Sequence, residues 1–501
     1  MIESPSRIEP VRCGPMRAAS GRVMYERDHV SDTPTADAPT EAARRRRRAP
    51  LLVVGGIVTA ALVAGALTIG GAFDGDGDSA APTAHERPAD GTPPPATSET
   101  PEPPSTVTRI TRADVKALTD ARTRALRDGD ASAFVSGIDP ANTELLSGQR
   151  RLLANLRLFP FAGAEFLPPT SLDVVQAADA GAYSHDMVIV FSHQLDGIDS
   201  EPVAETYTWT LSRASIDAPV RITKIVGSNA TSNPTRPIRY PAAWDGDEVA
   251  VVEREHILLA VAATDRDRAA AWADRAELAA KRNAEAWHGP AITPRRFAVF
   301  VPTKRETVRG VLGGLTGSCE LVTPARPGGG SMSPVGARVT FDGADTAFAS
   351  STNPDTGIGL IRRELAQAMV AQFAQSSLIG GGGRSRWVSE GFAYYLAGDD
   401  GFRNAARAEL RAGRFSGKLP VDTDLLPNVK GDQAAGAGFH VSMLTIRYLA
   451  EKYGAAEADG FVVAMYANPA SLDAAIKAAS GLERAAFEAG WADYVRAEIG
   501  G

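Results

Sequence analysis

Two segments with helical periodicity constrain the fold of this chain more than any other feature. In residues 358–375 an apolar side chain recurs at every fourth position, which predicts a helix with one buried face. The apolar positions are Ile361, Leu365, Met369 and Phe373. Arg363 and Gln367 are also four residues apart, so their side chains project together from another face, with Glu364 beside them.

A second helical segment, residues 386–398, follows a run of four glycines at 380–383. The glycines end the first helix and permit a sharp reversal of the chain, which requires no ligand. Trp387, Glu390 and Tyr394 fall on one face of the second helix because they are three and four residues apart. We expect Trp387 to lie in the core.

The helix pair resembles the active-site helices of the gluzincin metallopeptidases, the peptidase MA-like superfamily. In that family an HExxH helix is followed by a helix with the pattern WxxEGxAxY. The second pattern is present as Trp387, Glu390, Gly391, Ala393 and Tyr395. The first is present only as RELAQ over residues 363–367, so arginine and glutamine stand where the family has its two histidines.

The resemblance implies a zincin-like domain over residues 247–501, with a mixed sheet over the active-site helix and a helical C-terminal lobe. It also implies that Glu364 corresponds to the catalytic glutamate and Glu390 to the third zinc ligand. Arginine offers only N–H donors and stays protonated, so it cannot bind zinc. A guanidinium about 4 Å from a dication is repelled by about 8 kcal/mol at an effective dielectric constant of about 20. We therefore expect no zinc here, although the family uses it.

Arg363 is predicted to replace the metal as the positive charge of the cleft. A bidentate contact with Glu390, and a further contact with Glu364, would compensate the buried carboxylate and join the two helices. The predicted cleft residues are Arg363, Gln367, Glu390 and Tyr394. Glu364 and His440 are vestigial catalytic candidates, since many members of the family place an oxyanion-stabilising side chain where His440 falls. The alternative is that His440 is an ordinary histidine on a helix.

An uncharged stretch of 25 residues, 49–73, predicts a transmembrane helix. At about 1.5 Å per residue it reaches about 37 Å, enough for a hydrocarbon core of about 30 Å. A secretory signal would have a shorter apolar region of about 7 to 15 residues. Five arginines at 44–48 precede the stretch and three aspartates at 74–78 follow it, which favours a cytoplasmic N-terminus. We expect a single-pass protein of the cell membrane with most of the chain extracytoplasmic.

The remaining sequence predicts an α+β protein. Residues 1–48 lack apolar periodicity and are expected to be a disordered cytoplasmic tail, and residues 74–108 are a linker rich in proline and threonine. Residues 109–240 read as helices followed by antiparallel strands, an α+β domain similar to cystatin or NTF2-type folds. Two histidines at strand edges, His185 and His193, are expected to have structural roles.

Charge and cysteine content exclude several classes of function. With 53 basic and 60 acidic residues the net charge is −7, which gives no support for nucleic-acid binding. The two cysteines, Cys13 and Cys319, lie on opposite sides of the predicted membrane span and form neither a disulfide nor a CxxC metal site.

Three functions remain open at this point. The first is an inactive peptidase-like domain that binds a peptide or a cell-envelope partner. The second is an active metallopeptidase that recruits a metal through Glu364, Glu390 and His440. In the third, the 109–240 domain acts as a ligand-binding or assembly module and the C-terminal half is its scaffold.

Overall fold

The computed structural model describes residues 110–169, 183–215, 217–227, 242–292, 296–302, 317–322, 324, 333–344, 357–374 and 385–500. All of them belong to one compact unit. Several predicted segments lie outside the described residues, namely the tail at 1–48, the apolar stretch at 49–73, the linker at 74–108 and the glycines at 380–383. No helix in the described part is long and apolar enough to cross a bilayer. The α+β class is confirmed, with two separate sheets.

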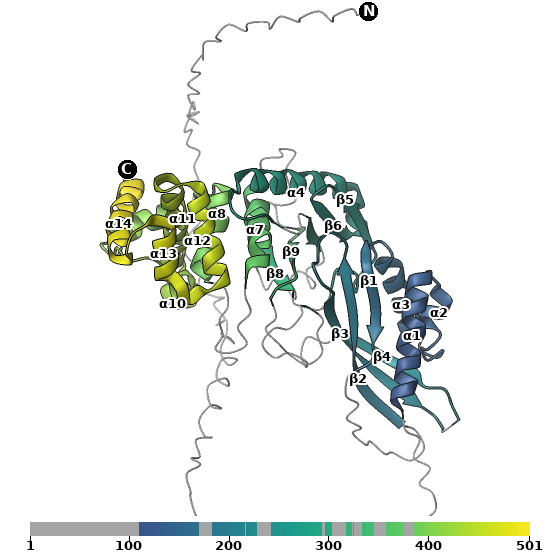
Figure 1. Ribbon diagram of the computed structural model, residues 1–501. Coiled ribbons are helices and arrows are strands. Elements are labelled where there is room, and N and C mark those ends of the chain that lie inside the picture. The colour runs from purple at the N-terminus through teal and green to yellow at the C-terminus, as the bar shows by residue number, and fades with distance from the viewer. Residues whose placement is uncertain are drawn as a thin grey trace, which may run out of the picture. The chain divides into compact units, whose positions relative to one another are not determined.

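The first sheet is antiparallel and has the order β1-β2-β3-β4. Its strands are β1 (Phe161–Leu167), β2 (Tyr183–Leu195), β3 (Val203–Arg213) and β4 (Arg221–Gly227). Three helices precede them, α1 (Arg112–Asp128), α2 (Ala131–Val135) and α3 (Thr143–Leu156). The three helices lie against one face of the sheet and share a core with it (Figure 1). The expected order of helices followed by strands is therefore present.

Local capping explains where these helices begin and end. Thr111 and Asp114 form a reciprocal capping box at the start of α1, which satisfies two backbone N–H groups that have no partner inside the helix. Gly129 ends α1 at φ 70°, a left-handed conformation that glycine adopts without a steric penalty. Asp130 and Asn142 cap α2 and α3 with their side-chain oxygens.

The second sheet is mixed and has the order β5-β6-β7-β9-β8. Its elements are β5 (Val249–Glu253), β6 (Ile257–Ala262), α4 (Arg266–Ala286), β7 (Phe297–Val301), β8 (Gly317–Val322), β9 (Gly336–Phe341) and α7 (Ile358–Val370). The three inner strands are parallel, and the edge strands β5 and β8 each run antiparallel to their neighbour. A mixed sheet beside the motif-bearing helix is what the sequence predicts.

Both faces of the second sheet are buried. In β6, Ile257, Leu259 and Val261 pack with α4 and α7, whereas Leu258 and Ala260 belong to the core of the first sheet. This alternation follows from the two-residue period of a strand. The described parts of the two sheets therefore share apolar contacts rather than meeting through polar surfaces.

A buried ion pair adds a polar connection between the two sheets. The guanidinium of Arg338 on β9 donates to both carboxylate oxygens of Asp199, which follows β2, at 2.7 and 2.8 Å. The bidentate geometry matches the fork of the guanidinium. Ser200 adds a backbone hydrogen bond to Val335 at 2.8 Å. The turn after β2 is thus fixed to the start of β9.

The C-terminal lobe is helical and has its own core. It contains α8 (Arg386–Ala397), α9 (Arg403–Arg411), α10 (Pro427–Lys430), α11 (Asp432–Lys452), α12 (Ala455–Ala467), α13 (Leu472–Ser480) and α14 (Arg484–Gly500). Helices α8 and α11 approach closely at Gly391, where a Cβ atom would lie 2.5 Å from the backbone oxygen of Ser442. The glycine of the EG pattern is therefore required by helix packing.

Replacing Gly391 by alanine is expected to lower the free energy of unfolding by about 1–3 kcal/mol, because the new methyl group would force α8 and α11 apart. Urea unfolding followed by circular dichroism measures the change. Gly460 in α12 is the matched control, since a Cβ there meets nothing within 4 Å. Gly460→Ala should stabilise by about 0.5–1 kcal/mol. Equal effects of the two substitutions would contradict the packing argument.

The segment that precedes β5 is attached to the first sheet by Trp244 and Asp245. Trp244 is fully buried among aromatic side chains of that sheet. The Asp245 carboxylate accepts hydrogen bonds from the Tyr207 hydroxyl at 2.7 Å and from the Ala242 N–H at 2.9 Å. Burial, followed by the charge of Glu205, raises the pKa of Asp245 to about 7, although the two hydrogen bonds oppose the rise.

This raised pKa predicts that stability depends on pH. Between the ordinary pKa of 3.8 and about 7, the unfolded chain ionises Asp245 while the folded chain keeps the proton. The free energy of unfolding should therefore fall as pH rises from 4 to 7, by at most about 1.4 kcal/mol per pH unit, and then level off. Asp245→Asn should remove this dependence in urea unfolding. Asp493→Asn is the control, because that side chain is 83% exposed. An unchanged pH profile in Asp245→Asn would contradict the prediction.

Candidate functional site

The two motif-bearing helices, α7 and α8, pack against each other as the sequence predicts. The apolar stripe of α7 faces the core, with Ile361, Leu365 and Met369 all buried. The last member of the stripe, Phe373, lies in a short 3₁₀ turn (Ala371–Phe373) rather than in the helix. Trp387 on α8 is buried in the core of the helical lobe, as expected.

Arg363 is held between a carboxylate and a tyrosine. Its Nε lies 3.3 Å from Oε1 of Glu364, and its Nη1 donates to the hydroxyl oxygen of Tyr394 at 2.9 Å. The guanidinium carbon also lies 4.9 Å from the centroid of the Tyr394 ring, a cation–π distance. The side chain of Arg363 is only 18% exposed. A fixed organic cation therefore lies between α7 and α8.

The surroundings of Arg363 and Tyr394 fix the protonation state of both side chains. Burial lowers the pKa of Arg363, but Tyr394, Glu364 and Glu390 raise it by more, so the guanidinium stays protonated. Burial raises the pKa of Tyr394 to about 12, with the guanidinium opposing the rise, so the hydroxyl stays neutral.

The predicted pairing of Arg363 with Glu390 is wrong in its geometry. Within the described residues, no ion pair of 4.0 Å or less joins the two side chains. Glu364, adjacent in sequence, supplies the carboxylate that contacts Arg363, and Tyr394 is the residue of α8 that Arg363 contacts. Glu390 is half-buried and acts on the guanidinium only through its charge.

Strand β8 lies directly over Glu364. A Cβ atom on Gly317, the first residue of β8, would lie 3.1 Å from Cγ of Glu364. Glu364 and Gln367 are both only 4% exposed. Gly317 is a site residue that the sequence analysis missed, because nothing in its local sequence distinguishes it from other glycines. The residues of the candidate site thus lie on α7, next to the edge strand β8.

His440 lies on α11, but its neighbour Phe439 is the residue of that helix whose ring contacts Tyr394 of the site. The charged groups that act on His440 are Asp399, Asp400, Arg403 and Arg447. Burial is the main cause that lowers the pKa of His440. Its neighbour Phe439 contacts the Tyr394 ring at a centroid distance of 5.6 Å. The structure therefore assigns the contact with the site to Phe439, which sequence reasoning did not identify.

The donor atoms at this site do not fit zinc. In the described part of the chain, the only group of three His, Cys, Asp or Glu side chains that could hold a metal is Glu255, His256 and Glu277. Glu364, Glu390 and His440 do not form such a group there. The Glu255 cluster already has a cation, since Nζ of Lys281 lies 3.3 Å from both carboxylates.

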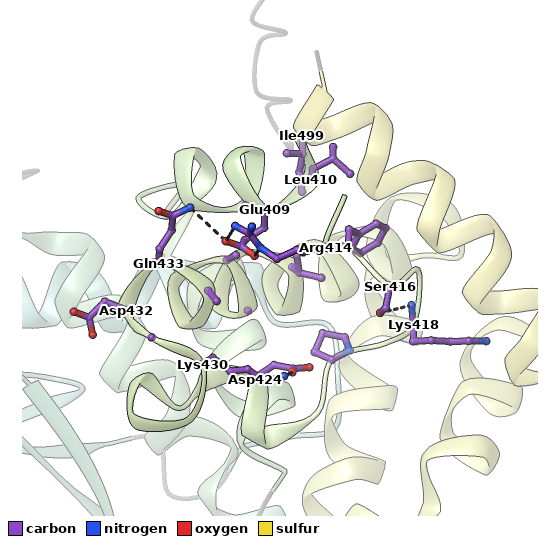
Figure 2. Close-up of a pocket in the computed structure, with 18 residues that line it drawn as sticks. Glu409, Leu410, Arg414, Ser416, Lys418, Asp424, Lys430, Asp432, Gln433 and Ile499 are labelled. Carbon is purple, nitrogen blue, oxygen red and sulfur yellow. Dashed lines mark hydrogen bonds and ion pairs between the residues drawn. The ribbon is translucent and has the colours of Figure 1, made fainter. Parts of the chain in front are cut away.

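A separate cavity of about 710 Å³ opens in the helical lobe (Figure 2). Its apolar walls include Leu410, Phe415 and Val441. Figure 2 shows the Arg414 guanidinium against Glu409, with hydrogen bonds of 2.6 Å, and Gln433 also donating to that carboxylate. None of the predicted site residues lines this cavity.

Comparisons with known proteins identify no family. No family model matches the chain, and no curated protein matches it. Among solved structures, it is similar to the M1 zinc metallopeptidase from Deinococcus radiodurans, with 14% sequence identity and a TM-score of 0.26. The match covers 62% of this chain and 61% of the other, so the chain spans about three fifths of the length of that peptidase.

Proposed function

We propose that this chain is a membrane-anchored extracytoplasmic protein whose peptidase-like domain binds an extended peptide segment of a cell-envelope partner without cutting it. The observation that carries the proposal is the position of Arg363. Arg363 stands at the sequence position where the resembled family has its first zinc-binding histidine, and its guanidinium contacts Glu364 and Tyr394. The membrane anchor rests on the apolar stretch at 49–73.

The site around Arg363 lacks two features that peptide hydrolysis requires. A zinc peptidase needs a metal that lowers the pKa of a bound water, and a carboxylate that takes the proton. Arginine and glutamine at 363 and 367 supply no zinc ligands comparable to histidine. Glu364 engages Arg363 at 3.3 Å, so one of its oxygens is already occupied. The site therefore offers recognition rather than chemistry.

An extended peptide would pair with the side of β8 that has no partner among the described strands. This strand is at the end of the sheet order, and among the named strands it pairs only with β9. An edge strand presents backbone N–H and C=O groups that an added peptide strand can pair with. Arg363, 18% exposed, lies below as a positive charge for a carbonyl or carboxylate of the peptide. Backbone pairing with β8 would supply the affinity, and the charge of Arg363 would set the orientation of the peptide.

The peptide-binding proposal predicts the effect of a change at Gly317. Gly317→Val would place Cβ 3.1 Å from Cγ of Glu364 and from the Phe341 ring, so β8 would be forced away from α7 and from Arg363. We expect the purified protein to bind members of an array of octapeptides, and this variant to bind them at least about tenfold more weakly. The control is Gly359→Ala on α7, where a Cβ meets nothing within 4 Å. Absence of binding by the unmodified protein, or equal binding by both variants, would contradict the proposal.

The metal-free character of the site can be tested by restoring the ligands. In Arg363→His combined with Gln367→His, two imidazoles would be four residues apart on α7, and Glu390 of α8 already acts on residue 363 through its charge. We expect about one zinc per chain in this variant by mass spectrometry and less than about a tenth of that in the unmodified protein. The single variant Arg363→His is the control and should bind zinc weakly. Stoichiometric zinc in the unmodified protein, with peptide hydrolysis lost in Glu364→Gln, would instead establish an active metallopeptidase.

A further inference from the structure

The first sheet and its helices enclose a second cation, Arg122 on α1. Its side chain is buried, with 3% of the residue exposed. Three aromatic rings surround the guanidinium, whose central carbon lies 3.8 Å from the centroid of Phe134, 5.1 Å from that of Phe166 and 5.3 Å from that of Trp209. Such a cage stabilises a cation, but its faces are apolar and carry no full negative charge.

The hydrogen bonds of this guanidinium are incomplete. An arginine has five N–H donors. One Nη donates to the backbone oxygen of Phe134 at 3.3 Å and the other to the side-chain oxygen of Gln149. The buried Nε has no hydrogen-bond partner, and no carboxylate of the described residues forms an ion pair with Arg122. A buried charge without a counter-ion is rare, because desolvation is compensated only when the charge is paired.

Two other arginines with little solvent exposure, Arg338 and Arg213, are paired with carboxylates. Arg338 has a bidentate pair with Asp199, and Arg213 contacts Asp114 at 2.6 Å. Arg122 has only neutral acceptors. Desolvation lowers its pKa to about 9, so the group is still charged at neutral pH. The molecule therefore keeps an uncompensated positive charge in the interior of the first α+β region.

Two further buried ring nitrogens of the same region are poorly satisfied. Nδ1 of His193 has no hydrogen-bond partner, Nε1 of Trp244 has only a weak interaction with the Tyr207 hydroxyl, and the two rings are in contact, with centroids 5.0 Å apart. Tyr207 connects the two places, since its hydroxyl interacts electrostatically with Arg122 and lies near Trp244. Unpaired buried polar groups are few in folded proteins, and each one calls for a ligand, a water or a functional role.

We propose that the space between helices α1–α3 and the first sheet binds a small organic carboxylate with an apolar body, and that Arg122 is its counter-ion. The free Nε–H and one Nη–H form the fork that receives a carboxylate in a bidentate manner. Gln149 is half-buried, so its amide can turn toward solvent and leave its place to the carboxylate. The aromatic rings favour a monoanion with an apolar body over a phosphate dianion, whose desolvation costs more. This inference does not depend on the candidate site around Arg363.

Benzoate is the probe for this site and benzamide is its neutral control, because the two share a shape and differ in charge. Calorimetry and thermal unfolding of the full chain measure binding at constant ionic strength. Benzoate at ten times its dissociation constant should raise the melting temperature by about 2 °C, and benzamide should not. Inorganic phosphate at equal ionic strength should have no effect.

Two arginine substitutions separate a ligand-binding role from a structural one. Arg122→Met should weaken benzoate binding at least tenfold and leave the melting temperature of the ligand-free protein unchanged or higher, because it removes a buried charge. Arg338→Met should lower the melting temperature, since it leaves Asp199 buried without its partner, and should not change benzoate binding. If Arg122→Met does not fold, Gln149→Ala provides the test, with an expected gain in benzoate affinity of at least about threefold.

Four results would overturn the proposal. The first is an equal shift of the melting temperature by benzoate and by benzamide, and the second is stabilisation by phosphate alone. The third is an unchanged benzoate affinity in Arg122→Met or Gln149→Ala. The fourth is a melting temperature of ligand-free Arg122→Met that falls as far as that of Arg338→Met. The last result would show that the aromatic cage alone compensates the charge.

Discussion

The burial of the second sheet on both faces is the constraint on which the described structure depends. Parallel strands such as β6, β7 and β9 have to be covered on two sides. Helices α4 and α7 cover one face, and the first sheet with its helices covers the other. This places α7, with its polar residues, directly beside the edge strand β8. The candidate site is therefore a consequence of how the central sheet is buried.

The same constraint gives the first α+β region a role in the architecture. Leu258 and Ala260 of β6 belong to its core, and Asp199 clamps β9 through Arg338. Removing that region would expose apolar side chains of β6 and leave Arg338 as a charge without its partner. A fragment that begins at β5 is therefore a poor test of the cleft. A fragment of residues 98–501 keeps both sheets and the helical lobe together.

Two buried arginines show opposite electrostatic solutions in one chain. Arg363 has a carboxylate, a hydroxyl and a ring around it, and its pKa is raised. Arg122 has rings and neutral acceptors only, and its pKa is lowered by burial. The first pattern is that of a cation that holds two helices together. The second is that of a cation that still lacks an anion.

Much of the fold could be predicted because periodicity and capping act locally. The mixed sheet and the helical C-terminal lobe are present as expected, since each of their strands and helices carries its own apolar pattern. Strand β1 was not expected. Its sequence FAGAEFL contains glycine and alanine, which are poor strand formers, so its pairing with β2 decides its conformation.

The sequence by itself determined which chemical groups the site contains, because Arg363, Glu364 and Gln367 lie within one predicted helix. Only the tertiary structure decided which groups meet. Arg363 contacts Tyr394 rather than Glu390, and Phe439 rather than His440 faces the Tyr394 ring. One residue along a helix turns a side chain by about 100°, so partners across a helix pair depend on packing geometry. That geometry is fixed by distant contacts, such as the approach of Gly391 to Ser442, which no local pattern contains.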